Sequence, residues 1–248
     1  MRVAALNDVH GNLPALEAVL SEVERLNVDR IVFGGDIAAG PLPRQTMDAV
    51  LALGDRAIAL HGNADRELVA IARGGRPDRH LPDDVRQLST WAAGQLGPRH
   101  RDYLAGLPPT VTLDVDALGE VLFCHASPRN DVEVFTAASG DARIEPMLAG
   151  VHQRVVVCGH THMQFDRSVG GVRIVNAGSV GMPYGPPGAY WLLLGPAVDL
   201  RLTQYDLEEA AHRIRTGGSP GADRFARSNV LQPPTAEEAI ARMAGNSE

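Results

Sequence analysis

Seven side chains that can bind metal ions are spread along this chain, each beside a glycine or at the end of an apolar run. They are Asp8, His10, Asp36, Asn63, His125, His160 and His162. Carboxylate oxygens, imidazole nitrogens and amide carbonyls are ligands that Mn, Fe, Co, Ni and Zn accept, so no thiolate is needed. Asp36 is the only carboxylate in a motif of its own, and we expect its two oxygens to bridge two cations. Because a hydroxide held between cations about 4 Å apart can attack a phosphorus centre in line, the set predicts a two-metal hydrolase.

The elements that must position these residues can be inferred from the apolar runs before them. Val3 to Leu6, Arg30 to Asp36 and Arg56 to His61 each have the composition of a β-strand. Apolar residues between Leu13 and Leu26 recur at three- and four-residue steps, which predicts a helix. The resulting βαβαβ unit would place one motif at the carboxyl end of each strand, where open α/β sheets bind their ligands.

Two pairs of these ligands are separated by a single position. Asp8 and His10 are expected on an extended segment, where side chains two residues apart point to the same side. The same holds for His160 and His162, so each pair is predicted to hold a cation from one strand end.

The second half of the chain returns to short apolar runs of strand composition. The expected strands are residues 120–124, 154–158, 172–175, 190–194 and 198–205. Their close spacing, with few helical patterns between them, predicts mostly antiparallel pairing. We therefore expect an α/β (α+β) fold in which two sheets pack face to face and are flanked by helices.

Each candidate ligand also has an ordinary structural explanation. Asp8 and Asn63 could cap helices, Asp36 could occupy a turn, and the histidines could be core or surface groups. A single histidine beside a glycine is weak evidence for a ligand. Four of the nine histidines, however, fall at expected strand ends in the order of a two-metal site, and this favours the metal site.

The pattern Asp-x-His-Gly-Asn, Gly-Asp, Gly-Asn-x-Asp, His and Gly-His-Thr-His resembles the calcineurin-like metallophosphoesterases, in particular their small bacterial phosphodiesterase branch. The resemblance covers residues 1 to about 207. It implies a four-layer αββα sandwich of two mixed β-sheets flanked by helices. It also implies two divalent transition-metal ions as cofactors, chosen from Mn, Fe, Co, Ni and Zn, and leaves their identity open.

The same resemblance implies how the ligands are shared. In that family one ion is held by the matches to Asp8, His10, Asp36 and His162. The other ion is held by the matches to Asp36, Asn63, His125 and His160. Catalytic roles fall on Asp36, Asn63 and His125, and all seven positions are intact here.

One departure from the family pattern concerns the leaving group. Many phosphatases of the family carry a histidine after Gly-Asn as the general acid, and the small bacterial branch often carries a cysteine, whereas this chain has Ala64. Because Ala64 cannot donate a proton, protonation of the leaving group must come from metal-bound water, from another residue or not at all. We therefore predict that activated esters are cleaved much faster than alkyl monoesters.

Three further residues are candidate substrate contacts. Asn12 is the expected N-cap of the first helix, whose terminal amides could face a phosphate oxygen, although capping alone also explains it. Arg66 and Arg129 follow ligand motifs closely, and arginine pairs well with phosphate. A surface salt bridge is the alternative for Arg129.

The chain is expected to form one domain over residues 1–248, with a helical insert at about 66–109 and a loosely specified tail from about 216. The insert follows the Gly62-Asn63 loop directly. It could therefore form a wall or lid for the substrate, or it could only cover the sheet. The tail could be a docking helix, a dimer contact or a partly disordered segment.

Composition limits the classes of partner that we expect for this chain. A hydrophobic content of 44% suits a globular core, and the net charge of −7 argues against general nucleic-acid binding.

No run approaches membrane-spanning length, and the first apolar run leaves no room for a signal peptide, so we expect a cytoplasmic protein. Cys124 and Cys158 lie in apolar runs and are expected to be buried thiols. The expected partner is a small phosphoester, and the oligomeric state is not predicted.

Three functions are compatible with this pattern. The favoured one is a dinuclear metal-dependent phosphoesterase, a phosphoric ester hydrolase acting on phosphodiesters or nucleotide-like substrates through a metal-bridging hydroxide. The second is a phosphomonoesterase acting on phosphoproteins or dinucleoside polyphosphates, against which Ala64 argues mildly. The third is a non-catalytic binding scaffold of the same fold, against which the intact ligand set argues.

Overall fold

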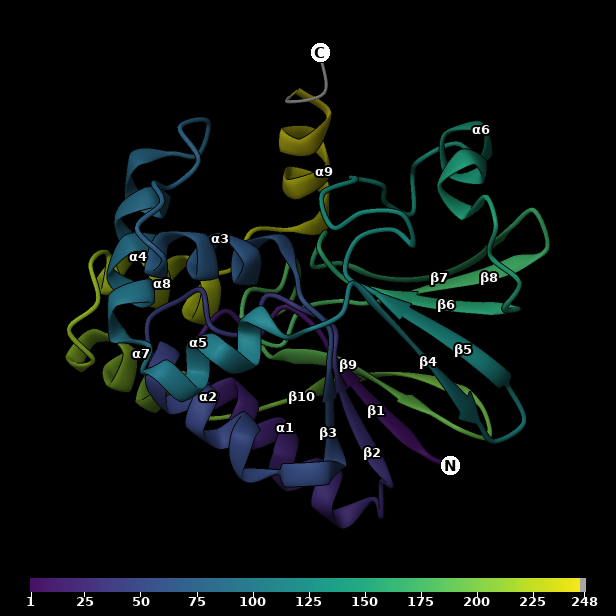
Figure 1. The fold of residues 1–248 in the computed structure, drawn as a ribbon, viewed down its shortest axis with the longest axis horizontal. Helices are drawn as coiled ribbons and strands as arrows, with labels where there is room; N and C mark the ends of the chain where they lie inside the picture. The colour runs from purple at the N-terminus through teal and green to yellow at the C-terminus, as the bar shows by residue number, and fades with distance from the viewer. Residues whose placement is uncertain (246–248) are drawn as a thin grey trace.

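The computed structural model describes residues 1–245 and contains two five-stranded β-sheets that pack face to face (Figure 1). The first sheet has the strand order β10-β9-β1-β2-β3. Its strands are β1 (Val3–Leu6), β2 (Arg30–Phe33), β3 (Ala57–Ala59), β9 (Ala189–Leu194) and β10 (Val198–Thr203). β1, β2 and β3 are parallel, as the predicted βαβαβ unit requires, whereas β9 runs antiparallel to both β1 and β10.

The second sheet has the strand order β4-β5-β6-β8-β7. Its strands are β4 (Thr110–Val115), β5 (Gly119–Cys124), β6 (Val155–Cys158), β7 (Gln164–Val169) and β8 (Val172–Ala177). The prediction of mostly antiparallel pairing is wrong for its centre, because β5, β6 and β8 are parallel. It holds for β9 with β10 in the first sheet, and the edge strands β4 and β7, which were not predicted, are antiparallel as well. Residues 125–154 connect β5 to β6 and are long enough for the crossover that parallel strands need.

Helices cover the outer face of the first sheet. They are α1 (Leu13–Arg25), α2 (Pro43–Ala52), α3 (Asn63–Ala72), α4 (Asp83–Gln95) and α5 (Pro98–Ala105), with a 3₁₀ turn η1 (Gly54–Arg56) between α2 and β3. Leu16 of α1, Met47 of α2 and Leu68 of α3 are fully buried in one cluster with Leu6 of β1 and Phe33 of β2. The first helical layer is thus fixed to the sheet by apolar burial.

A second apolar cluster lies between the two sheets. Val3 and Ala5 of β1 and Val32 of β2 meet Val121 and Phe123 of β5 there. Since β1 also sends alternate side chains to the helical layer, it is buried on both faces, as a central strand of a layered α/β fold should be. Fully burying a valine or phenylalanine side chain contributes roughly 1.5–3 kcal/mol, so this cluster holds the two sheets together.

The outer face of the second sheet carries the fourth layer. It consists of the short helix α6 (Asp141–Ile144), the 3₁₀ turn η2 (Glu145–Leu148) and the loop before them. Ile144, Met147 and Phe135 pack there against Cys124 and Cys158, which are buried free thiols as predicted. The four-layer αββα architecture with two mixed sheets is therefore confirmed, with a fourth layer much thinner than the first.

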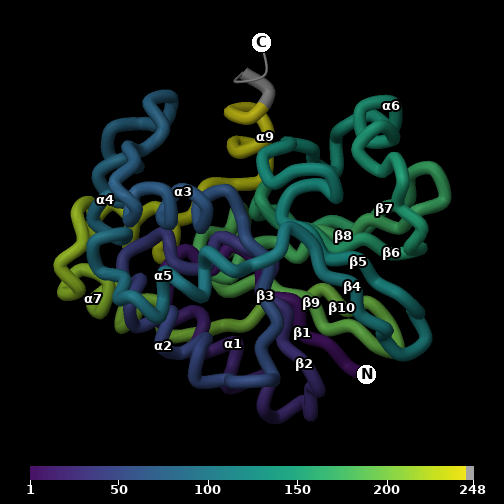
Figure 2. Tube along the Cα trace, in the orientation of Figure 1, coloured from purple at the N-terminus to yellow at the C-terminus, as the bar shows by residue number. Residues whose placement is uncertain are grey.

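The C-terminal segment forms α7 (Leu207–Thr216), α8 (Ala222–Phe225), a π-helical turn η3 (Ala226–Leu231) and α9 (Ala236–Gly245). Ile214, Phe225 and Val230 pack with Leu13 of α1 and with Leu42. Most of the predicted tail is thus packed on the first helical layer, and α9 projects beyond it (Figure 2). The division of the chain into one domain with an insert stays a prediction.

Within residues 1–245, no helix combines the length and the hydropathy needed to cross a lipid bilayer.

Candidate metal centre

The loops that follow five strands bring the seven predicted ligands together. Asp8 and His10 follow β1, Asp36 follows β2, Asn63 follows β3, His125 follows β5, and His160 and His162 follow β6. Main-chain hydrogen bonds join the loops within each sheet. The Asp8 amide donates to the Gly35 carbonyl at 3.1 Å in the first sheet, and the Gly159 amide donates to the His125 carbonyl at 2.8 Å in the second. The carboxyl ends of the parallel strands therefore meet at one edge of the molecule.

The backbone at these ligands is not extended, and this corrects the prediction for both closely spaced pairs. Asp8, His10, His160 and His162 have φ angles of 55°, 46°, 65° and 58°, and Asp36 has 54°. A left-handed backbone at a residue with a side chain costs about 1–3 kcal/mol and persists only where the surroundings enforce it. Here they do, since for example the His10 amide donates to the Asp36 carbonyl at 2.9 Å. The side chains converge because of this loop geometry rather than because of strand alternation.

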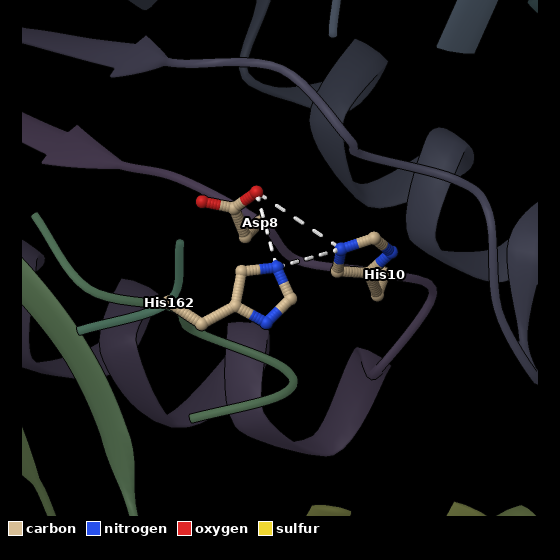
Figure 3. Close-up of side chains that lie close together, drawn as sticks. All are labelled: Asp8, His10 and His162. Atoms are coloured by element: carbon tan, nitrogen blue, oxygen red, sulfur yellow. Dashed lines mark hydrogen bonds and ion pairs between the residues drawn. The ribbon is translucent and has the colours of Figure 1, made fainter. Parts of the chain in front are cut away.

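Asp8, His10 and His162 form the first half of the cluster (Figure 3). The two imidazole Nε2 atoms are 3.2 Å apart, and Asp8 Oδ1 lies 3.4 Å from Nε2 of His162 and 4.0 Å from Nε2 of His10. The Nδ1 atoms instead face carbonyls, that of Ala39 at 3.2 Å for His10 and that of Met182 at 2.8 Å for His162. Because a carbonyl only accepts, both Nδ1 atoms carry the hydrogen, and both Nε2 lone pairs point at each other.

Asp8 offers a further ligand atom to the same half of the cluster. Its Oδ2 accepts a hydrogen bond from the His160 amide at 2.9 Å, whereas its Oδ1 is buried with no hydrogen-bond partner within residues 1–245. A buried carboxylate oxygen without a partner costs free energy. Two imidazole lone pairs and one such oxygen around a common point fit a divalent cation.

Asp36, His125, Asn63 and His160 form the second half. Oδ2 of Asp36 lies 3.5 Å from Nε2 of His125 and 3.6 Å from Nε2 of His10, so it stands between the two halves. Its Oδ1 accepts a hydrogen bond from the Ala64 amide at 2.8 Å. Oδ2 would thus be free to hold a cation, and the predicted bridging role of Asp36 stays a prediction.

The remaining second-half ligands surround the same carboxylate. His125 Nδ1 donates to the Gly34 carbonyl at 2.9 Å, which leaves Nε2 for a ligand. The side-chain amide of Asn63 lies 3.1 Å from that Nε2 and 3.2 Å from Nδ1 of His160. The rings of His125 and His160 stand edge to face with centroids 5.0 Å apart. These donors suit a second cation beside the first.

The electrostatics of the cluster differ between its histidines. Burial lowers the pKa of His10, and burial together with the nearby His125 lowers the pKa of His160 to about 4, so both rings are neutral at neutral pH. Burial alone would also lower the pKa of His125, but the charge and hydrogen bond of Asp36, with Asp8 adding to them, raise it to about 10. A cation at the second half must therefore displace a proton from His125.

Residues outside the predicted set hold the loops in place. Asp65 is fully buried and accepts hydrogen bonds from the amides of Gly62 at 3.2 Å and Ile37 at 3.0 Å, which ties the β3 loop to the β2 loop. Burial and the charge of Asp36 raise the pKa of Asp65 to about 7. Asp65 is the last residue of the Gly-Asn-x-Asp motif, so the motif signals it although its role was not predicted.

The end of β8 and the loop after it support the other ligands. Asn176 donates from its side chain to the Gly159 carbonyl at 2.7 Å, and Ser179 donates to the Asp8 carbonyl at 2.8 Å. Both side chains are buried. The sequence places them directly after an apolar run, but nothing in residue type alone shows which main-chain groups they hold.

The three predicted substrate contacts each have partners within the protein. Asn12 is fully buried and is used as a helix cap, accepting from the Ala15 amide at 3.3 Å and donating to the Gly181 carbonyl at 3.0 Å. Arg66 pairs with Asp131, and Arg129 pairs with Glu133. A substrate role for Asn12, Arg66 and Arg129 stays a prediction.

A cavity of about 410 Å³ opens beside the cluster. Its inner end is lined by His10, Asp36, Asn63 and Ala64. One wall comes from α4 and from Leu81, two residues before it, and the other from residues 220–229. Helix α4 thus borders the cavity, and Ala92 and Ala93 of the same helix pack in the apolar cluster over the first sheet. A role of this region as a wall or lid for the substrate stays a prediction. This volume lies within the range of small-molecule sites, roughly 300–1,000 Å³.

The family model of the calcineurin-like phosphoesterase superfamily domain matches residues 1–194. The chain therefore belongs to the calcineurin-like phosphoesterase superfamily, a class of metal-dependent phosphoric ester hydrolases. Among solved structures, a metallophosphoesterase from Sphaerobacter thermophilus is 27% identical, with a TM-score of 0.72 over 93% of this chain and 99% of that chain. A hypothetical protein from Pyrococcus horikoshii shares the fold, with 22% identity and a TM-score of 0.80 over 94% of this chain and 99% of that chain.

The curated relatives are matched only in part. A symmetrical bis(5'-nucleosyl)-tetraphosphatase from Vibrio campbellii is 30% identical over 128 residues, which are 46% of this chain and 48% of the relative. A symmetrical bis(5'-nucleosyl)-tetraphosphatase from Nitrosococcus oceani is 26% identical over 68% of this chain and 58% of the relative. The chain thus spans about half the length of these relatives.

Proposed function

We propose that this protein is a dinuclear metal-dependent phosphoesterase that hydrolyses phosphodiesters or nucleotide-like substrates. The observation that carries the proposal is the convergence of the Nε2 atoms of His10, His125 and His162 on the carboxylates of Asp8 and Asp36 at the inner end of a cavity.

We propose two ion sites that share Asp36. The first uses Asp8, His10, Asp36 and His162, and the second uses Asp36, Asn63, His125 and His160. When bound, two divalent ions would activate a water for in-line attack on phosphorus and offset the charge of the phosphoryl oxygens. The oxygen and nitrogen donors suit Mn, Fe, Co, Ni or Zn.

The residues of the chain orient this chemistry. The carbonyls of Ala39, Met182 and Gly34 hold three imidazole rings with Nε2 turned inward. Asp36 keeps one oxygen between the two halves because the Ala64 amide holds the other. Burial of the carboxylates excludes bulk water and strengthens their attraction for cations.

The position of Ala64 at the inner end of the cavity bears on the leaving group. Since its side chain cannot donate a proton, the reaction would favour alcohols of low pKa, which can leave as anions. We expect kcat/KM for p-nitrophenyl esters to exceed that for alkyl monoesters by about a hundredfold or more. Similar values for both substrate types would contradict this prediction.

The decisive experiment is hydrolysis of bis-p-nitrophenyl phosphate and p-nitrophenyl phosphate by purified protein. The protein is first treated with a chelator and then supplied with Mn, Ni or Zn, and Asp36→Asn serves as the inactive control. Metal-dependent cleavage of the diester that disappears in the variant would support the proposal. Two bound ions without turnover on any substrate would instead favour a binding scaffold.

The names of the partly matched relatives favour a second candidate, hydrolysis of dinucleoside polyphosphates. Diadenosine tetraphosphate as substrate in the same assay separates the two. A kcat/KM for this substrate well above that for bis-p-nitrophenyl phosphate would favour the second candidate.

A further inference from the structure

The walls of the cavity come from two segments that are far apart in sequence. Leu81, Val85 and Leu88 belong to the α4 side, and Phe225 and Asn229 to the C-terminal side. Leu88 also packs against the apolar cluster that contains Phe225. The two walls are therefore in contact with each other as well as with the cavity.

The lining beyond the metal ligands is mostly apolar, and its charges are largely paired. Arg224 is the one lysine or arginine among the lining residues, all of which belong to the described part of the chain, and it forms an ion pair with Asp84 of the opposite wall. Glu67 accepts a hydrogen bond from the Asp78 amide at 3.1 Å. No free cation in this lining is thus available for a second phosphate.

The remaining polar groups in the lining beyond the metal ligands are neutral hydrogen-bonding side chains. Gln87 and Ser89 come from α4, and Asn229 comes from the facing wall. Amide and hydroxyl groups can recognise the edge of an uncharged ring, whereas the leucine, valine and phenylalanine side chains can pack on its faces. This chemistry suits the organic part of a phosphoester rather than its phosphate.

We propose that this cavity binds the ester group of the substrate and that it selects an uncharged, ring-bearing group over one that carries a second phosphate. The proposal rests on the proposed function for the position of the phosphate, which would lie at the inner end beside Asp36. The selecting residues are Val85, Leu88 and Phe225, with Gln87 and Asn229 at the polar positions.

A cavity-filling variant tests the first part. Val85 has 36% of its surface exposed on α4, so Val85→Trp can place an indole in the cavity with little damage to the core. Thr90→Trp is the matched control, because Thr90 is exposed on the same helix and does not line the cavity. We expect Val85→Trp to raise KM for bis-p-nitrophenyl phosphate about tenfold or more while inhibition by inorganic phosphate stays unchanged.

The same variants can be tested without turnover. Binding of the uncharged fluorophore 7-methoxycoumarin, followed by fluorescence anisotropy, should weaken about tenfold in Val85→Trp and stay unchanged in Thr90→Trp. If the protein hydrolyses no phosphoester, the proposed function fails and this binding still decides the role of the cavity. Equal effects of the two tryptophan variants in both measurements would overturn the proposal.

A pair of matched substrates tests the selection against a second phosphate. Thymidine 5'-(p-nitrophenyl phosphate) should be hydrolysed with a kcat/KM about tenfold or more above that of its 3'-phosphorylated form, because the cavity would have to bury an unpaired anion. A preference for the phosphorylated form would overturn the second part and support polyphosphate substrates instead.

Discussion

The loops at the strand ends and the helical walls of the cavity are built on different principles. Five ligands in the loops have left-handed φ angles, and main-chain hydrogen bonds hold those loops from two sheets. The walls consist of regular helix and a π-helical turn, joined by apolar packing and by the exposed ion pair of Arg224 with Asp84. The loops therefore hold each atom in one position, whereas the walls define a volume that several side chains could fill.

The two regions meet different chemical requirements. Metal binding needs each ligand atom within tenths of an ångström of its required position, and the strained backbone of the loops provides this precision at a cost in free energy. Recognition of an ester group needs shape and polarity, which a wall can change by single side chains. Substitutions in the two regions should consequently differ in size and in the kinetic constant they affect.

The largest difference is expected between two aspartates of equal charge. Asp36→Asn should lower kcat about a thousandfold or more, because it removes the carboxylate placed between the two halves of the cluster. Asp84→Asn should change kcat/KM less than about fivefold, because Asp84 only pairs with Arg224 across the cavity. Steady-state kinetics with bis-p-nitrophenyl phosphate measures both, and similar losses in the two variants would remove the distinction.

Two helix-capping glycines provide the next test. A Cβ on Gly62, the N-cap of α3, would lie 2.1 Å from Asp36 Oδ1, whereas a Cβ on Gly97, the N-cap of α5, meets no atom within 4 Å. We expect Gly62→Ala to lower activity and metal affinity about 10- to 100-fold, because it displaces the bridging carboxylate. Gly97→Ala should leave both unchanged, as measured by kinetics and by metal titration.

The raised pKa of His125, one of the ligands in the loops, predicts how the stability of the metal-free protein depends on pH. Asp36 outweighs burial and raises this pKa from 6.5 to about 10, so the metal-free folded protein binds more protons than the unfolded chain between those values. The resulting stabilisation is fully present below 6.5 and is lost as the pH rises through about 10. The melting temperature of metal-free protein should therefore fall between pH 7 and 10.

Metal affinity should follow the opposite trend over the same range. Because a cation must displace the His125 proton, binding should tighten as the pH rises, and adding Mn or Zn at pH 7 should release about one proton. Calorimetry in buffers of different ionisation enthalpy measures this release. His125→Asn keeps an uncharged polar side chain and should abolish it.

The smallest effect is expected at the ion pair between the walls. The side chain of Arg224 is 61% exposed, so the pair with Asp84 should contribute no more than about 1 kcal/mol to stability. Arg224→Gln should leave kcat unchanged and shift KM only about two- to fivefold, because it loosens the cavity without touching the ligands. A large loss of kcat would show that the walls control the chemistry as well.

What the sequence predicts differs between the two regions for a physical reason. The ligands can be recognised in the sequence because metal chemistry restricts residue type. Asp8, Asp36 and the pair His160 and His162 therefore stand out before anything is known of the fold. Their left-handed backbone was not predicted, since it arises from contacts between loops and not from local preference.

The walls illustrate the opposite case. The helices of residues 66–109 could be predicted from apolar spacing, but their position beside the ligands could not. Strands β4 and β7 lie at sheet edges and contain charged residues such as Asp114 and Asp166, which hides their strand character. The facing wall at residues 220–229 has no residue pattern that indicates a binding site.

The cytoplasmic location expected from the sequence stays a prediction.

The residues of the C-terminal wall lie beyond residue 194, where the family match ends. A segment that carries none of the proposed ligands thus borders the space next to them. Recombination or drift in this segment could change what the protein accepts while the inherited reaction stays the same. For the same reason, grafting residues 207–245 between relatives should change the part of the selectivity that this wall provides, with the α4 wall and the proposed ligands left to the receiving chain.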